Sequence, residues 1–156
     1  MGPASSLEII PLKSLPSGLP VCARWNYEQW GRKAGRSLAG TLVDLERIAN
    51  SENGEHVVMA MVDNRPAGMA LLIECDLETH RHLKPWVAGV YTAPEFRSRG
   101  VASEMLRNLE SLARAGGVEA IYLYTAIPKL YETLNWVVLE QLHFDDGEMV
   151  VMQRQL

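Results

Sequence analysis

A short basic segment, Arg97-Ser98-Arg99-Gly100-Val101-Ala102-Ser103, has residue types suited to binding an anion. It follows an apolar run at residues 86–92 that is typical of a strand, and it opens a run at residues 101–115 that is typical of a helix. A turn of small residues between strand and helix leaves several backbone N–H groups unpaired, and the helix dipole adds partial positive charge there. Arg97 and Arg99 raise that charge further. The segment therefore predicts a phosphate site.

A second segment, Leu130-Tyr131-Glu132-Thr133-Leu134-Asn135-Trp136, follows one expected strand later. Together the two segments resemble the GNAT superfamily of acyl-CoA-dependent N-acetyltransferases. In that family an Arg/Gln-x-x-Gly-x-Gly/Ala turn holds the CoA pyrophosphate, and a Leu-Tyr-x-x-x-Gly-Trp/Phe segment follows. The resemblance runs from about Val57 to the C-terminus. Ala102 replaces the commoner Gly, and Asn135 replaces the Gly before Trp136; because Asn tolerates the left-handed conformation, we expect that turn to survive.

The resemblance implies that acetyl-CoA is the co-substrate, with its pyrophosphate on the backbone N–H groups of the basic turn. It also implies that the strand before the turn separates from its neighbour and exposes backbone groups to the pantetheine amides. A backbone N–H of this strand is the family's usual donor to the oxyanion. The alternatives are an ordinary helix start and an ordinary buried strand. The residues expected to contact the cofactor are Val90, Tyr91, Thr92, Thr125 and the turn from Arg97 to Ser103.

Tyr131 is the candidate general acid. A phenol has a reference pKa of about 10 and a thiol of about 8.5, so tyrosine is the weaker acid in water. It can still donate a hydrogen bond to a developing thiolate that water does not reach. The resemblance implies that its hydroxyl lies beside the CoA sulfur. The alternative is a tyrosine that packs a helix on the sheet, an interpretation that suits the strand residues Tyr122 and Tyr124.

Glu74 is the candidate general base, because an alkylammonium with a pKa of about 10 must lose its proton before it can attack a thioester. It ends the expected strand beside the cofactor strand, where it could instead anchor the acceptor or lie on the surface. Asp76, Glu78, His80 and His82 follow on a loop and are further candidates. His-x-His lacks a third ligand at a recognisable spacing, so we expect no metal.

Large aromatic side chains are frequent in the first half of the chain: Trp25, Tyr27, Trp30 and Trp86. Some could form a cation–π wall for an amine, and the others would be core. Trp30, Trp86 and Glu74 are the candidate acceptor contacts. The acceptor could be an amino sugar such as an aminoglycoside, a polyamine, an amino acid, or a protein N-terminus or lysine. The basic loop Arg32–Arg36 could instead receive an acidic acceptor.

Two other function classes compete with an acetyltransferase. One is a non-catalytic acyl-CoA-binding sensor on the same fold, against which the retained Tyr131 argues. The other is a nucleotide-binding domain with a different phosphate loop. Neither a Gly-x-x-x-x-Gly-Lys-Ser/Thr nor a Gly-x-Gly-x-x-Gly segment occurs, so the sequence disfavours the second class.

Length and composition predict one soluble globular domain over residues 1–156, with residues 1–6 disordered. Hydrophobic residues make up 47% and charged residues 22%, and no stretch approaches the ~18 apolar residues of a membrane span. The formal charge of −4 argues against nucleic acid and suits an amine acceptor. Cys22 and Cys75 lie in no ligand pattern and are interpreted as free thiols of a cytoplasmic protein, since no export sequence is evident.

The apolar patterns predict elements in the order β, α, α, β, β, β, α, β, α, β, β, which is also the order that the resemblance implies. We therefore expect an α+β fold, layered α/β/α, with a mostly antiparallel central sheet of about seven strands and helices on both faces. Leu7–Leu12 is expected as an edge strand, Ser14–Pro20 as a loop and Val21–Trp30 as a helix, with Ser37 capping the next helix.

Asp145-Asp146-Gly147 predicts a hairpin between apolar runs near the C-terminus. The hairpin as a whole, Trp136–Gln153, is apolar on much of both faces. Because an exposed edge strand favours pairing with another chain, we expect a homodimer.

Overall fold

The computed structural model describes residues 6–156, so the expected disorder at residues 1–6 lies, except for Ser6, outside the described residues. Within that range the element order is the expected one. The elements are β1 (Leu7–Pro11), α1 (Leu19–Asn26), α2 (Leu38–Ala49), β2 (His56–Val62), β3 (Arg65–Ile73), β4 (Trp86–Thr92), α3 (Val101–Ala115), β5 (Ala120–Thr125), α4 (Pro128–Glu132), β6 (Val137–Phe144) and β7 (Gly147–Gln155).

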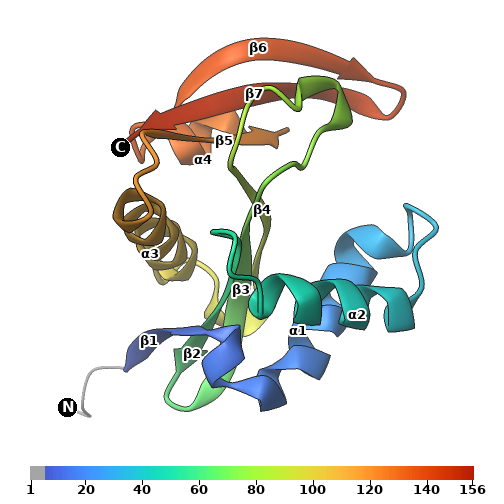
Figure 1. Ribbon diagram of the computed structural model, residues 1–156, viewed down its shortest axis with the longest axis vertical. Helices are drawn as coiled ribbons and strands as arrows, with labels where there is room; N and C mark the ends of the chain where they lie inside the picture. The colour runs from blue at the N-terminus through green and yellow to red at the C-terminus, as the bar shows by residue number, and fades with distance from the viewer. Residues whose placement is uncertain (1–5) are drawn as a thin grey trace.

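The strands form one sheet in the order β1-β2-β3-β4-β5-β7-β6, so the edge position expected for the first strand is confirmed. Each neighbouring pair is antiparallel except β4 and β5, which run parallel. These two strands pair only at Trp86 and Tyr122. Figure 1 shows β4 crossing steeply away from β5 and β7. The centre of the sheet therefore opens beyond the start of β4.

Helices cover both faces of the sheet, with α1 and α2 on one side of β2–β4 and α3 on the other (Figure 1). Successive residues of a strand point to opposite faces. On β2, Val57 and Met59 pack into the cluster that contains α1 and α2, and Val58 and Ala60 pack into the cluster that contains α3. The expected layered α+β class is thus confirmed.

Local sequence rules account for several boundaries. The Ser37 hydroxyl accepts a hydrogen bond of 2.9 Å from the backbone N–H of Gly40 and caps α2. Asp63 and Asn64 both adopt positive φ, the conformation of a two-residue hairpin turn. One boundary differs from expectation. The helix α1 begins at Leu19, because Pro20 fits the first helical turn, where its missing N–H costs nothing.

The end of the first helical segment also differs from a regular helix. Residues Tyr27–Gly31 form a π-helical turn, a widening that is frequent at functional sites. It continues directly from α1 and leads into the basic loop. The segment expected as a loop before α1 holds two short 3-10 turns, Leu12–Ser14 and Pro16–Gly18.

The outer strand β6 carries exposed apolar side chains at Val137, Val138 and Leu139. Its outer edge has no strand partner among the described residues. We propose that two copies pair through this edge, and we expect the mass of a dimer by light scattering. Leu139→Lys places a charge on the edge and should shift the mass toward that of a monomer. A monomer mass for the parent at high concentration would contradict the proposal.

Candidate active site

The basic turn forms as the sequence indicates. Ser98 and Gly100 have φ of +62° and +78°, and Gly100 is the residue before α3. Within residues 6–156, no backbone N–H from Ser98 to Ser103 donates a hydrogen bond; the first to do so is that of Glu104, to the Gly100 carbonyl at 3.1 Å. Left-handed residues interleaved with a helix start create an anion-binding concavity of the kind that holds phosphate.

Three arginines lie around this turn. Arg97 donates a hydrogen bond of 3.1 Å from Nε to the Thr92 carbonyl. Arg99 and Arg65 both lie over the ring of Phe96, at 5.7 and 5.0 Å from its centroid. Arg65 starts β3, far from the turn in sequence, and sequence reasoning missed it because no local pattern links the two. Together these cations favour an anionic ligand at the N-terminus of α3.

The strand β4 breaks its regular pairing at Gly89, which has φ of +57°. The register with β3 shifts at this point. Beyond the shift, Val90, Tyr91 and Thr92 have no pairing with β5, so the β4 backbone facing β5 is open to a ligand. The side chain of Tyr91 packs instead against Trp25, with ring centroids 5.2 Å apart, so a contact from Tyr91 to a ligand would come from its backbone.

Tyr131 lies in α4 and is 7% exposed. Its ring packs edge-on against Trp136 at 6.1 Å, and its hydroxyl has no hydrogen-bond partner in the described part of the chain. Burial raises the pKa of the Tyr131 phenol above its ordinary value. Asn135 adopts φ of +70°, so the expected turn before Trp136 is confirmed. The phenol stays protonated and is available to donate to a ligand.

The opposite wall of the opening carries aromatic side chains. The Tyr124 ring on β5 lies 6.3 Å from that of Trp86 and 6.2 Å from that of Phe144. Trp86, expected among the substrate contacts, is fully buried and donates its indole N–H to the Leu83 carbonyl at 2.6 Å. It therefore presents no surface to a substrate in this conformation and supports Tyr124 instead. Trp30 is exposed in the π-helical turn.

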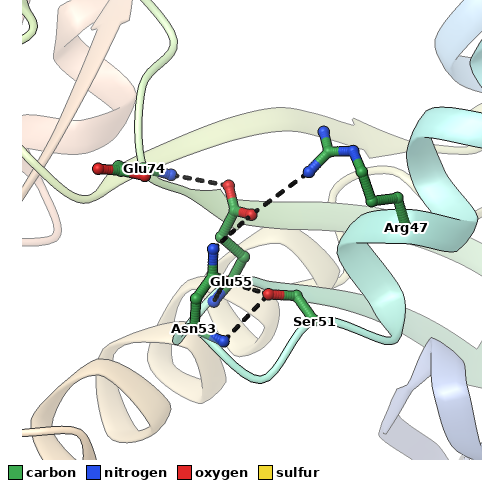
Figure 2. A network of polar contacts seen from close by, with 5 residues as sticks. All are labelled: Arg47, Ser51, Asn53, Glu55 and Glu74. Carbon is green, nitrogen blue, oxygen red and sulfur yellow. Dashed lines mark hydrogen bonds and ion pairs between the residues drawn. The ribbon is translucent and has the colours of Figure 1, made fainter.

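Glu74 follows β3 directly, and its side chain is 66% exposed, with Oε1 3.8 Å from Lys84 Nζ. Figure 2 shows how its backbone is held. Glu55 Oε2 accepts a 3.0 Å hydrogen bond from Glu74 N, while Glu55 Oε1 lies 3.7 Å from Arg47 Nη1. Asn53 and Ser51, bonded to one another, complete the network. The network fixes the start of the β3–β4 loop through the backbone of Glu74, not through its carboxylate.

Asp76, two residues into that loop, is the carboxyl with the most unusual environment. It is half-buried and has no hydrogen-bond partner among the described residues, and desolvation raises its pKa from 3.8 to about 7 despite the opposing charge of Arg36. Its own charge contributes to the raised pKa of Tyr124, which is due mainly to burial. The charges of Asp76 and Arg36 therefore both act on Tyr124.

The other loop candidates are engaged elsewhere. His80 Nε2 lies 2.7 Å from Glu140 Oε2 on β6, and the rings of His80 and His82 stack at 5.8 Å. Glu78 accepts two hydrogen bonds from Arg81. The sequence places Asp76 among these candidates but does not distinguish it from the others, because the burial of Asp76 depends on tertiary packing. Of this loop, Asp76 alone combines burial with a carboxyl that makes no hydrogen bond within residues 6–156.

A cavity of about 870 Å³ lies at the other end of α3. It is lined by residues from the C-terminal end of α3 and from the facing ends of β2, β3, β5 and β7, including Glu74, Lys84, Gly117, Tyr122 and Gln153. A helix of 15 residues spans about 22 Å, which separates this cavity from the basic turn. This cavity is thus distinct from the basic turn. Glu74 lines this cavity, and Asp76 is not among its lining residues.

No group of three or more His, Cys, Asp or Glu side chains within residues 6–156 is arranged to hold a metal ion. None of the helices in this range has the length and apolar character needed to cross a membrane.

Comparison with known proteins identifies the family. The solved structures that resemble the chain include a GNAT-family acetyltransferase from Streptococcus pneumoniae (15% identity, TM-score 0.73, covering 97% of this chain and 99% of that one) and an aminoglycoside 6'-N-acetyltransferase in complex with coenzyme A (14%, 0.74, 95% and 96%). A third is Ard1 from Thermoplasma volcanium (15%, 0.68, 99% and 99%). No curated protein matches the sequence. The model of the acetyltransferase (GNAT) family matches residues 19–136, and the chain therefore belongs to this family.

Proposed function

We propose that this enzyme transfers the acetyl group of acetyl-CoA directly to a primary amine of a small molecule. One observation carries the cofactor side of the proposal. The unpaired backbone N–H groups of Ser98 to Ser103 lie beside three arginines and follow a strand, β4, whose backbone is open toward β5. The unpaired N–H groups beside the arginines suit a phosphate, and the open backbone of β4 suits the amide groups of pantetheine.

The proposed reaction needs a neutral amine, a stabilised oxyanion and a proton for the departing sulfur. The amine loses its proton to a carboxylate, directly or through water, and its lone pair attacks the thioester carbon. The C–N bond forms, and the oxyanion accepts a hydrogen bond from the β4 backbone near Val90. The C–S bond then breaks, and the thiolate receives a proton from Tyr131. The new amide nitrogen gives up its remaining extra proton to water, and the Tyr131 phenolate takes a proton back from water.

We assign the base to Asp76 first and to Glu74 second. A base works best when its pKa lies near the working pH, and desolvation raises the pKa of Asp76 to about 7. Glu74 has a solvated carboxylate 3.8 Å from Lys84, which favours a role in binding charge over a role in proton transfer. Trp30, exposed in the π-helical turn, remains a proposed acceptor contact.

Among the acceptors, amino sugars draw support from the similarity to an aminoglycoside 6'-N-acetyltransferase. At 14% identity that similarity carries the fold alone, so polyamines and amino acids stand beside amino sugars. A protein N-terminus or lysine is the second candidate. A sensor that binds acetyl-CoA without transfer is the remaining alternative, and thiol release in the presence of amines separates it from an enzyme.

Binding of acetyl-CoA tests the cofactor assignment. A ligand present at 100 times its Kd stabilises a protein by about 2.7 kcal/mol, which for a chain of this length raises Tm by roughly 5–10 °C. We expect acetyl-CoA and CoA to give such a shift in a thermal melt. A shift with ATP or NAD but none with CoA would reject the assignment.

Gly100→Glu tests the location of the pyrophosphate. The added carboxylate stands at the turn and repels phosphate, so acetyl-CoA binding by calorimetry should be lost while the fold persists. A Cβ at Gly100 would meet nothing within 4 Å, so only its φ of +78° strains the backbone. Gly117→Glu is the matched control, because Gly117 has φ of +81°, equal free space and a place at the other end of α3. Normal CoA affinity in Gly100→Glu would put the pyrophosphate elsewhere.

A further inference from the structure

Arg65 brings a distant segment of the chain to the basic turn. It follows the two-residue hairpin turn between β2 and β3, where its backbone pairs with Val62. Two residues farther along β3, the Ala67 carbonyl accepts a hydrogen bond of 2.8 Å from the backbone N–H of Ala93, the residue that follows β4. The start of β3 is therefore fixed beside the segment that leads from β4 into the basic turn.

The ring of Phe96 holds two guanidinium groups near one another. This ring is buried, and the guanidinium carbons of Arg65 and Arg99 lie 5.0 and 5.7 Å from its centroid. Both arginines are exposed, and within residues 6–156 neither forms an ion pair or a side-chain hydrogen bond, not even with the adjacent Glu95. Two like charges on one ring repel each other, and an anion of high charge between them would relieve that repulsion.

The chemistry of CoA supplies such an anion. Its phosphates form two groups, the pyrophosphate and a monoester at the 3' position of the ribose. A phosphate monoester carries a charge of about −1.5 to −2 near neutral pH and offers three strong acceptor oxygens. If the backbone N–H groups from Ser98 to Ser103 hold the pyrophosphate, only one ribose separates it from the monoester. A cation for the monoester must therefore lie beside the turn but outside it, and Arg65 meets this condition.

We propose that Arg65, with Arg99 beside it, binds the 3'-phosphate of CoA and makes the enzyme select CoA over 3'-dephospho-CoA. This inference rests on the proposed function and deepens its cofactor side. A guanidinium binds a phosphate through two parallel hydrogen bonds, and stacking on Phe96 restricts the orientations of Arg65 in advance. Arg99 belongs to the turn and also serves the pyrophosphate, so the selectivity depends on Arg65.

Two ligands that differ only in the 3'-phosphate test the proposal: CoA and 3'-dephospho-CoA. In calorimetric titrations at one fixed salt concentration, we expect the parent to bind CoA at least about tenfold more tightly, the usual effect of a charged hydrogen-bonded partner. Arg65→Gln should weaken CoA binding by about tenfold and leave the Kd of 3'-dephospho-CoA within about twofold. Retained binding of 3'-dephospho-CoA also shows that the variant is folded and that its turn is intact.

Two more variants separate a local contact from the net charge of the protein. Arg65→Glu should reverse the preference in favour of 3'-dephospho-CoA, because the introduced carboxylate repels the monoester. Arg114→Gln is the matched control. Arg114 is an exposed arginine in the last turn of α3, also without an ion pair within residues 6–156, and its loss should leave the preference unchanged.

The outcomes separate this inference from the proposed function. Equal affinity of the parent for the two ligands, or a preference that survives Arg65→Glu, would overturn the assignment of the 3'-phosphate while leaving acetyl-CoA as the co-substrate. A preference that is lost equally in Arg114→Gln would also overturn it, because net charge would then account for the effect. Binding of neither ligand to the parent would overturn the proposed function, and this inference with it.

Discussion

Tyr131→Phe is expected to lower kcat by at least about tenfold while acetyl-CoA affinity stays within about twofold. General acid catalysis is typically worth ~100- to 10,000-fold, and the lost interaction forms mainly in the transition state. The ring and its contact with Trp136 remain in the variant. Because the hydroxyl has no partner among the described residues, its removal breaks no internal hydrogen bond, and Tm should stay the same.

The pH profile gives a second measurement. Burial raises the pKa of Tyr131, so the phenol donates throughout the ordinary assay range and ionises above pH 10. The parent should therefore lose activity at that alkaline limit, and the phenylalanine variant should lack this step. Tyr122→Phe removes a phenol from β5 that the proposed reaction does not use, and it serves as the control. Turnover of Tyr131→Phe at the parent rate would assign Tyr131 to packing alone.

Local chemistry explains what the sequence could predict. Three features depend only on a few neighbouring residues and on the backbone preferences of each residue type: the basic turn, the cap at Ser37 and the left-handed Asn135. The element order follows from apolar periodicity in the same way. The cap at Ser37, the conformation at Asn135 and the position of the turn at the start of α3 are confirmed, because each is stabilised by neighbouring residues, while anion binding by the turn stays a prediction.

Features that depend on distant segments could not be predicted. Arg65 reaches the turn only because the β2–β3 hairpin places it over Phe96. Asp76 is distinguished from the carboxylates around it by burial, and its neighbour Arg36 comes from another loop. Trp86 was expected to contact the substrate, but packing between β4 and β5 buries it completely. A residue type shows what a side chain can do, and the fold decides whether a ligand can reach it.

The site combines two layers of the molecule across the opening beside β4. One side supplies the basic turn proposed to hold phosphate and the phenol of Tyr131; Tyr131 belongs to the same core cluster as Val101, the first residue of α3. The other side supplies the α1–α2 loop, Asp76 and Tyr124. Because β4 and β5 pair only at Trp86 and Tyr122, a thioester lying along β4 would be accessible from both sides. This arrangement supports direct transfer, since donor and acceptor can approach from opposite faces.

Asp76→Asn is the variant that decides the identity of the base. Asparagine keeps the shape of the side chain but cannot accept a proton, so kcat/KM at pH 8 should fall by ~100-fold or more. The parent profile should show an acid limb near pH 7, where Asp76 becomes protonated, and the variant should lack it. Glu78→Gln, on the exposed part of the same loop, should change neither kcat/KM at pH 8 nor the acid limb of the pH profile. An acid limb that survives in Asp76→Asn and disappears in Glu74→Gln would make Glu74 the base.

The stability of Asp76→Asn provides an independent measurement, because this variant should gain stability while it loses activity. The Asp76 pKa rises from 3.8 to about 7 on folding, so between these two values the folded state holds a proton that the unfolded state has lost. The free energy of unfolding therefore decreases as pH rises from about 4 to about 7, and the full penalty applies above pH 7. Asparagine never ionises and avoids this penalty. Thermal melts should show Asp76→Asn more stable than the parent at pH 8 and nearly equal to it at pH 4. If Asp76→Asn is more stable than the parent and also lacks the acid limb, folding disfavours the ionised carboxylate at this position, as expected of a base positioned for proton transfer. Equal stability of the two proteins at both pH values would contradict the burial of Asp76.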